Sequence, residues 1–162
     1  MAYKTNILRE IVQRLCGSVA VARAVWRGSE RVDGIEVCGR PEFRREVTKA
    51  LGLLRDKRLP AWDTLSQHVG SIVEGRITDG TPSAHPVLLT VDGPDSSRGP
   101  EYLAASIAHM ACCTQLYRNY EVEFPGRRVP RDVFAGTAAK ERCDKAFYEC
   151  LSVLGKGVKG DA

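Results

Sequence analysis

His109 and Cys113 are the two residues of this sequence whose types and spacing could do chemistry. They lie in a stretch, residues 102–117, that has no glycine or proline and, up to Cys113, no charged side chain. In a helix, residues four positions apart project from the same face, about one turn from each other. Imidazole nitrogen and thiolate sulfur are both ligands of Zn²⁺. The pair therefore predicts part of a metal site.

A helix that supplies two ligands needs a third from another part of the chain. Glu141, in a helix expected at residues 137–154, is the acidic residue that we expect to complete the site. Its carboxylate would add an oxygen ligand of a kind that zinc also accepts. The predicted metal ligands are therefore His109, Cys113 and Glu141, with zinc as the ion.

The run at residues 107–117 looks like the metal-binding helix of small zincin-like proteins, whose pattern is H-[ED]-x-x-H. The segment 136–141 is similar to the helix from which such proteins take a glutamate as third ligand. The resemblance spans roughly residues 50–155 and implies a metallopeptidase-like scaffold that binds zinc. Met110 stands where the family has its catalytic acid, and Cys113 stands where it has the second histidine.

In the mechanism that this resemblance implies, a carboxylate takes a proton from metal-bound water and passes it to the leaving group. The thioether of Met110 cannot do so. The expected function is therefore that of a degenerate zincin-like scaffold, a non-catalytic or regulatory binding protein rather than an enzyme. Its partner would be an unidentified protein or peptide.

Two other interpretations of the same helix stay open. His109 and the neighbouring cysteines can be core residues, with the imidazole hydrogen-bonded to a backbone carbonyl. Alternatively, the chain is an active zinc-dependent hydrolase with an altered site, in which Glu141 or Glu101 acts as the base.

A cysteine nucleophile is a third possibility, with Cys112 or Cys113 activated by His85 or His68. A thiolate needs a nearby base and partial exposure, and the apolar surroundings argue against exposure.

An adaptor function is the last alternative. Four arginines follow the central stretch, with aromatic residues among them, and could bind an acidic partner or a phosphate group. These are Arg118, Arg127, Arg128 and Arg131.

Composition restricts the class of protein. The net charge of +4 comes from basic and acidic residues that are interspersed, whereas a nucleic-acid-binding surface needs a concentrated basic face. No uncharged apolar run approaches the ~20 residues that a membrane span requires. Six cysteines without a C-x-x-C pair or a secretory signal are typical of free thiols in a reducing cytoplasm.

The stretch 102–117 is apolar nearly all round, which predicts a buried central helix. Apolar periodicity predicts further helices, and two short β-branched runs predict strands. The expected helices are the first part of residues 6–26, residues 41–55, 62–73 and 137–154. The expected strands are 87–91 and a short edge strand at 32–37, within a loop or hairpin at residues 27–40, and residues 92–100 are expected to be a loop.

These elements predict an α+β, mostly helical fold, with four or five helices packed around the buried central helix and a small β-sheet. Residues 1–155 are expected to form one domain, and residues 156–162 a flexible tail.

Overall fold

A computed structural model describes residues 27–155 of the chain, so the expectations for residues 6–26 and 156–162 fall outside the described residues. The strands are β1 (Ser29–Val32), β2 (Ile35–Cys38), β3 (Val69–Gly75), β4 (Asp79–Thr81) and β5 (Val87–Asp92). The helices are α2 (Pro41–Asp56), α3 (Pro60–His68), α4 (Gly93–Ser96), α5 (Pro100–Glu123), α6 (Arg131–Ala135) and α7 (Thr137–Gly155).

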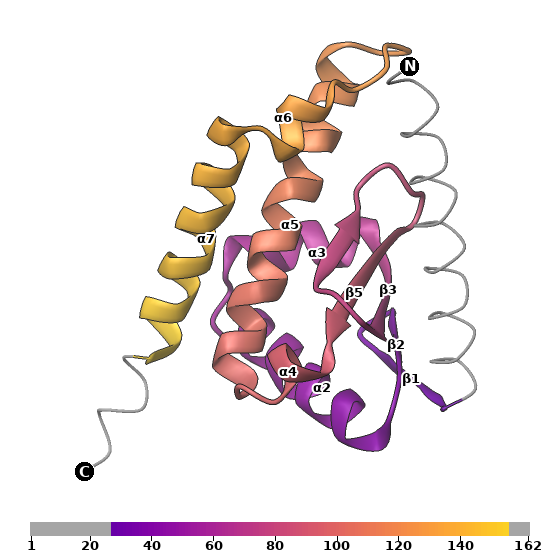
Figure 1. Ribbon diagram of the computed structural model, residues 1–162, viewed down its shortest axis with the longest axis vertical. Helices are drawn as coiled ribbons and strands as arrows, with labels where there is room; N and C mark the ends of the chain where they lie inside the picture. The colour runs from indigo at the N-terminus through magenta and orange to yellow at the C-terminus, as the bar shows by residue number, and fades with distance from the viewer. Residues whose placement is uncertain (1–26, 156–162) are drawn as a thin grey trace, which may run out of the picture.

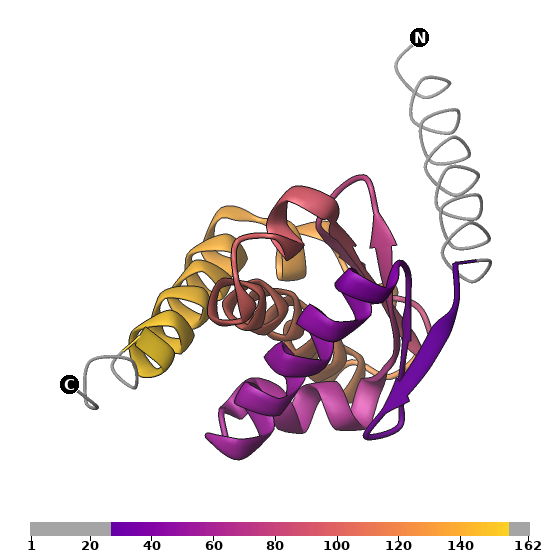
Figure 2. The same cartoon turned by 90° about the horizontal axis from the view of Figure 1, so that it is seen from below.

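The elements form layers, with the helices of the described chain on one face of a five-stranded sheet (Figures 1 and 2). Helices α2, α3 and α5 lie closest to the sheet, and α7 packs on the side of α5 that faces away from it. Helix α5 therefore lies between the sheet and α7, in the middle of the molecule (Figure 2). This confirms the predicted α+β, mostly helical fold with a buried central helix.

The sheet is mixed, in the order β1-β2-β3-β5-β4. Strands β2, β3 and β5 run parallel, whereas the edge strands β1 and β4 are antiparallel to their neighbours. The loop or hairpin expected at residues 27–40 is a hairpin, made by β1 and β2, and the single edge strand expected at residues 32–37 is divided between them by the turn at 33–34. Because β4 is an edge strand beside β5, it comes close to the middle of α5.

Helix α5 is buried because its small and apolar residues face a neighbour on almost every side. Leu103 and Ile107 are fully buried in the main core, together with side chains from the sheet, α2, α3 and α7. Helix α5 begins at Pro100 and ends at Glu123, so it is longer at both ends than the apolar stretch that predicted it. None of the helices between residues 27 and 155 is both long and apolar enough to cross a membrane.

The prediction of one helix over residues 62–73 is wrong from Val69 onward. Helix α3 ends at His68, and the next seven residues form the strand β3 between β2 and β5. Valine and isoleucine fit both a helix stripe and a buried strand, so the local pattern cannot decide between them. Backbone hydrogen bonds on both edges of β3 decide in favour of the strand. A Cβ atom on Gly70 would lie 2.5 Å from the ring of Pro86, so this strand also needs a glycine there.

The loop expected at residues 92–100 contains the short helix α4. The Asp95 backbone N–H donates to Asp92 Oδ1 at 2.7 Å, which closes the first turn after β5. The sequence shows the turn-forming residues, but not that they make a helical turn.

The carboxylate of Glu74, in β3, joins the sheet to the start of α2. It accepts hydrogen bonds from the backbone N–H of Arg40 at 2.9 Å and from Arg40 Nε at 2.7 Å, and its side chain is 6% exposed. Burial alone would raise the pKa of Glu74, but the hydrogen bonds and charge of Arg40 outweigh it, so the pKa lies below its ordinary value. A carboxylate whose pKa is lower in the folded than in the unfolded state stabilises the fold when it is ionised. This stabilisation is complete at pH values above the unfolded-state pKa and is lost as the pH falls through the folded-state pKa.

Glu74→Gln is therefore expected to lower the free energy of unfolding by about 1.5–3 kcal/mol at pH 7, the range for hydrogen bonds to charged groups. Below pH ~4 the difference from wild type should shrink, because the wild-type carboxylate becomes protonated. Urea denaturation at several pH values measures both effects. The control is Glu46→Gln, which removes an exposed pair with Lys49 and should cost less than about 1 kcal/mol. A Glu74→Gln effect that stays constant down to pH 3 would contradict the assignment.

Candidate metal centre

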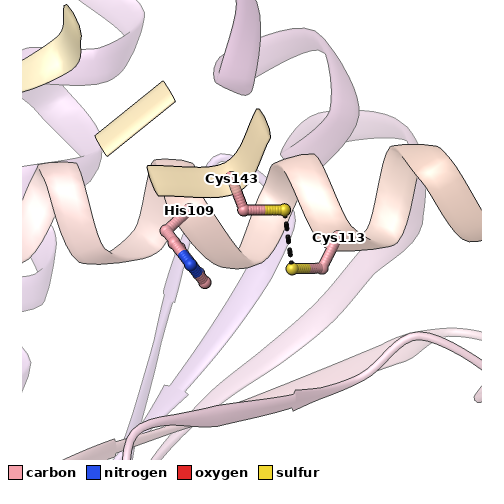
Figure 3. Close-up of side chains that lie close together, drawn as sticks. All are labelled: His109, Cys113 and Cys143. Carbon is pink, nitrogen blue, oxygen red and sulfur yellow. Dashed lines mark hydrogen bonds between the residues drawn. The ribbon is translucent and has the colours of Figure 1, made fainter. Parts of the chain in front are cut away.

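His109, Cys113 and Cys143 come together where α5 packs against α7. Their ligand atoms all lie within 4.8 Å of one another, and no other such group of three occurs among the described residues. Cys113 Sγ and Cys143 Sγ are 2.9 Å apart (Figure 3). His109 and Cys113 are partly buried, and Cys143 is fully buried.

Helix geometry alone places the first two ligands together. Residues four apart on α5 share a face, and in this segment that face points toward α7 and β4. The sequence-based expectation that His109 and Cys113 lie side by side agrees with the structure.

The third member of the group is Cys143, and not the expected Glu141. Glu141 is exposed on α7 and does not belong to the group. Successive helix residues are about 100° apart around the axis, so residues 141 and 143 face nearly opposite directions. The apolar stripe of α7 at Phe147 and Cys150, extended one turn toward the N-terminus, reaches Cys143, and this was the signal in the sequence that pointed to it.

The three side chains of the group shift the pKa values of one another. The hydrogen bond from Cys143 and the neighbouring imidazole of His109 together lower the pKa of Cys113 to about 5, against the effect of burial. The hydrogen bond with Cys113 raises the pKa of His109 above its ordinary value, although burial opposes this. Hydrogen bonds to Cys112 and Cys113 raise the pKa of Cys143, which therefore keeps its proton. These shifts favour a Cys113 thiolate beside His109 at neutral pH, with the Cys143 thiol as the hydrogen-bond donor.

Asp144 orients the imidazole. Its Oδ1 atom lies 3.2 Å from His109 Nε2. A carboxylate at one ring nitrogen fixes the orientation of the imidazole and increases the basicity of the other nitrogen, which is how many metal-binding histidines are held. Nδ1 is then the nitrogen left for an ion.

A cavity of about 510 Å³ adjoins the group, and both His109 and Cys113 line it. The β4 side contributes Asp79, and the rim toward α6 and α7 carries the exposed cations Arg131 and Lys140. The other lining residues are Thr78, Gly80, Pro82, Ser106, Met110, Thr114, Phe134, Ala135 and Phe147. The sequence did not predict this cavity, because its walls come from four separate segments.

Comparison with known proteins gives no relative: no family model, no curated protein and no solved structure matches the chain.

The donor set of the group could hold a metal ion. One imidazole and two thiols are nitrogen and sulfur ligands of the kind that zinc prefers. Two thiolates on one tetrahedral zinc stand ~3.8 Å apart, given a Zn–S length of about 2.3 Å. The 2.9 Å between Cys113 Sγ and Cys143 Sγ means that these side chains would separate by about 1 Å on binding.

The other candidate residues lie away from this group. His85 contacts Arg118 and Glu121, and the pKa of His68 is lowered by burial and by the nearby charge of Arg118. The imidazole beside Cys113 is thus that of His109, and neither His85 nor His68. Glu101, in the first turn of α5, does not line the cavity.

The four arginines of the possible adaptor surface differ in their exposure. Arg118 is buried and donates to the Ala84 carbonyl oxygen and to Glu121, so it fixes the turn before β5. Arg127 and Arg128 are exposed, and Arg131 is at the cavity rim.

Proposed function

We propose that this protein is a non-catalytic metal-binding protein built on a zincin-like scaffold, with zinc held by His109, Cys113 and Cys143. The observation that supports it best is the convergence of three ligand atoms within 4.8 Å from two packed helices. Two ligands come from a buried helix at positions i and i+4, and the third comes from a later helix. Zincin-like proteins have their metal ligands in the same order along the chain.

The surroundings of the site support a binding role over hydrolysis. Met110 lines the cavity next to His109 and cannot act as a base. Glu141 is exposed, and neither it nor Glu101 reaches the cavity. Bound zinc would act here as a structural ion that ties α5 to α7. The proposal includes a reducing cytoplasmic location, where thiol ligands stay available, and a protein or peptide partner at the cavity.

Metal analysis of the purified chain tests this proposal. The wild-type protein, dialysed against zinc and then against metal-free buffer, is expected to retain about one zinc per chain, since three such ligands make a tight site. His109→Ala should retain less than about a tenth of that amount. His68→Ala is the matched control, because it removes a partly buried histidine outside the group and should retain zinc like wild type.

Equal and negligible zinc in wild type and His109→Ala would refute the metal-binding proposal. Chelator-sensitive hydrolysis of peptide or ester substrates, lost in His109→Ala, would instead favour the active hydrolase.

A further inference from the structure

Three thiols, and not two, meet between α5 and α7. Cys143 contacts both Cys113 and Cys112, its two neighbours on α5, and all three are free thiols. The sulfur atoms of Cys113 and Cys143 are already closer than two non-bonded sulfurs that merely pack side by side. A bond between them requires a change of about 0.9 Å in their separation, to the ~2.05 Å of a disulfide.

The thiols differ in how a reagent can reach them. Cys113 lines the cavity of about 510 Å³ and is partly exposed, whereas Cys143 lies behind it with no exposed surface. A small molecule that enters the cavity therefore meets Cys113 first. Cys143 is therefore expected to react second, by attacking Cys113 Sγ once Cys113 has formed a mixed disulfide with the reagent.

The charges at the cavity indicate which reagent enters. Arg131 and Lys140 are exposed lining residues, and His109 lies beside Cys113. Asp79 is the one carboxylate among the lining residues of the described chain. Two flexible cations at the rim favour a small disulfide that carries carboxylates over a neutral one.

We propose that Cys113 and Cys143 form a redox-active dithiol that is oxidised to a disulfide by an anionic low-molecular-weight disulfide entering through the cavity. This goes beyond the metal-binding proposal and does not depend on it, because it needs only the two sulfur atoms and the cavity.

The reaction has two exchange steps. Cys113 sulfur attacks one sulfur of the small disulfide, the S–S bond of the reagent breaks, and one small thiolate leaves and takes up a proton. Cys143 sulfur then attacks Cys113 Sγ, the mixed disulfide breaks, and the second small thiol leaves with the proton that Cys143 gives up. In total the two cysteines lose two electrons, which reduce the reagent to two thiols. Of the two protons that these thiols take up, one comes from Cys143 and the other from Cys113 or, where Cys113 is already a thiolate, from the solvent.

The test uses the full chain, freed of metal with a chelator and incubated with glutathione disulfide. Trypsin cleaves after Arg98, Arg118, Arg142 and Lys145, so residues 99–118 and 143–145 separate unless a disulfide joins them. Mass spectrometry without reduction is expected to find these two peptides linked, and fragmentation should place the bond at Cys113. The number of free thiols should fall by two, and dithiothreitol should restore it.

Variants separate the two steps. Cys143→Ser is expected to stop at the mixed disulfide, so a glutathionyl group should accumulate on Cys113. Cys150→Ser is the matched control, because it removes another buried thiol of α7 and should give the wild-type product. Lys140→Glu should slow the reaction several-fold with glutathione disulfide, but not with the neutral hydroxyethyl disulfide.

Three results would overturn the proposal, and the first two need only the wild-type chain. The first is that the thiols stay free in excess glutathione disulfide, and the second is that Cys143 forms its bond with Cys112 in place of Cys113. The third is that wild type accumulates a stable mixed disulfide as abundant as that in Cys143→Ser. Equal slowing of both reagents by Lys140→Glu would overturn the choice of an anionic disulfide. Because metal is removed beforehand, failure here leaves the zinc measurements unaffected, and absence of zinc binding leaves this test unaffected.

Discussion

Cys143→Ser is expected to weaken zinc binding by at least about 100-fold, whereas Glu141→Gln should leave the affinity unchanged within about twofold. Loss of a residue that only orients a ligand already costs about 10–100-fold, so loss of a ligand should cost at least as much. Cys143 Sγ lies 2.9 Å from Cys113 Sγ, whereas Glu141 is exposed on another face of α7. Competition with a chromophoric chelator measures the affinity.

The control for this experiment is Cys150→Ser, which removes a thiol of similar burial two turns further along α7. It should bind zinc like wild type. If Glu141→Gln weakened binding and Cys143→Ser did not, the His109, Cys113 and Glu141 set expected from the sequence would be the correct one, and α7 would have to be rotated about its axis.

Ile107→Ala should be among the most destabilising single changes in the described chain, with a loss of about 2–5 kcal/mol in the free energy of unfolding. Ile107 is fully buried in the main core, on the helix that lies between the sheet and α7. The substitution removes buried methyl groups and leaves a cavity that packed neighbours on both sides cannot close.

Urea denaturation followed by circular dichroism measures this loss. Val122→Ala, on the same helix but 81% exposed, is the control and should change stability by less than about 0.5 kcal/mol. A comparable loss in both variants would mean that burial in the main core does not set the cost of the Ile107 substitution, because alanine favours a helix at both positions.

Much of the fold was predictable because several segments carry an unambiguous local pattern. The apolar stretch 102–117 predicted the buried helix α5, and the stripe of Phe147 and Leu151 predicted α7. Val87 to Val91 predicted β5, in which alternate residues are buried. In each of these segments the local pattern predicts one kind of secondary structure, and the tertiary packing leaves that secondary structure in place.

The strand β3 shows where local patterns stop being sufficient. Its valines and isoleucine continued the helical spacing of α3, and only pairing with β2 and β5 makes the segment extended. Strand partners lie 35 and 17 or 18 residues away along the chain, so no window of neighbouring residues contains this information.

The site divides in the same way. The sequence by itself determined that His109 and Cys113 are neighbours, because helix geometry fixes the relation of residues four apart, and that their helix is buried, because it has almost no polar face. Only the tertiary structure decided that Cys143 joins them, and that a cavity with Arg131 and Lys140 at its rim opens beside the thiols. The physical reason is that α7 has two nearly opposite faces, one with Cys143 and one with Glu141. The rotation of α7 about its axis selects which face meets His109 and Cys113, and packing across the whole interface with α5 sets this rotation.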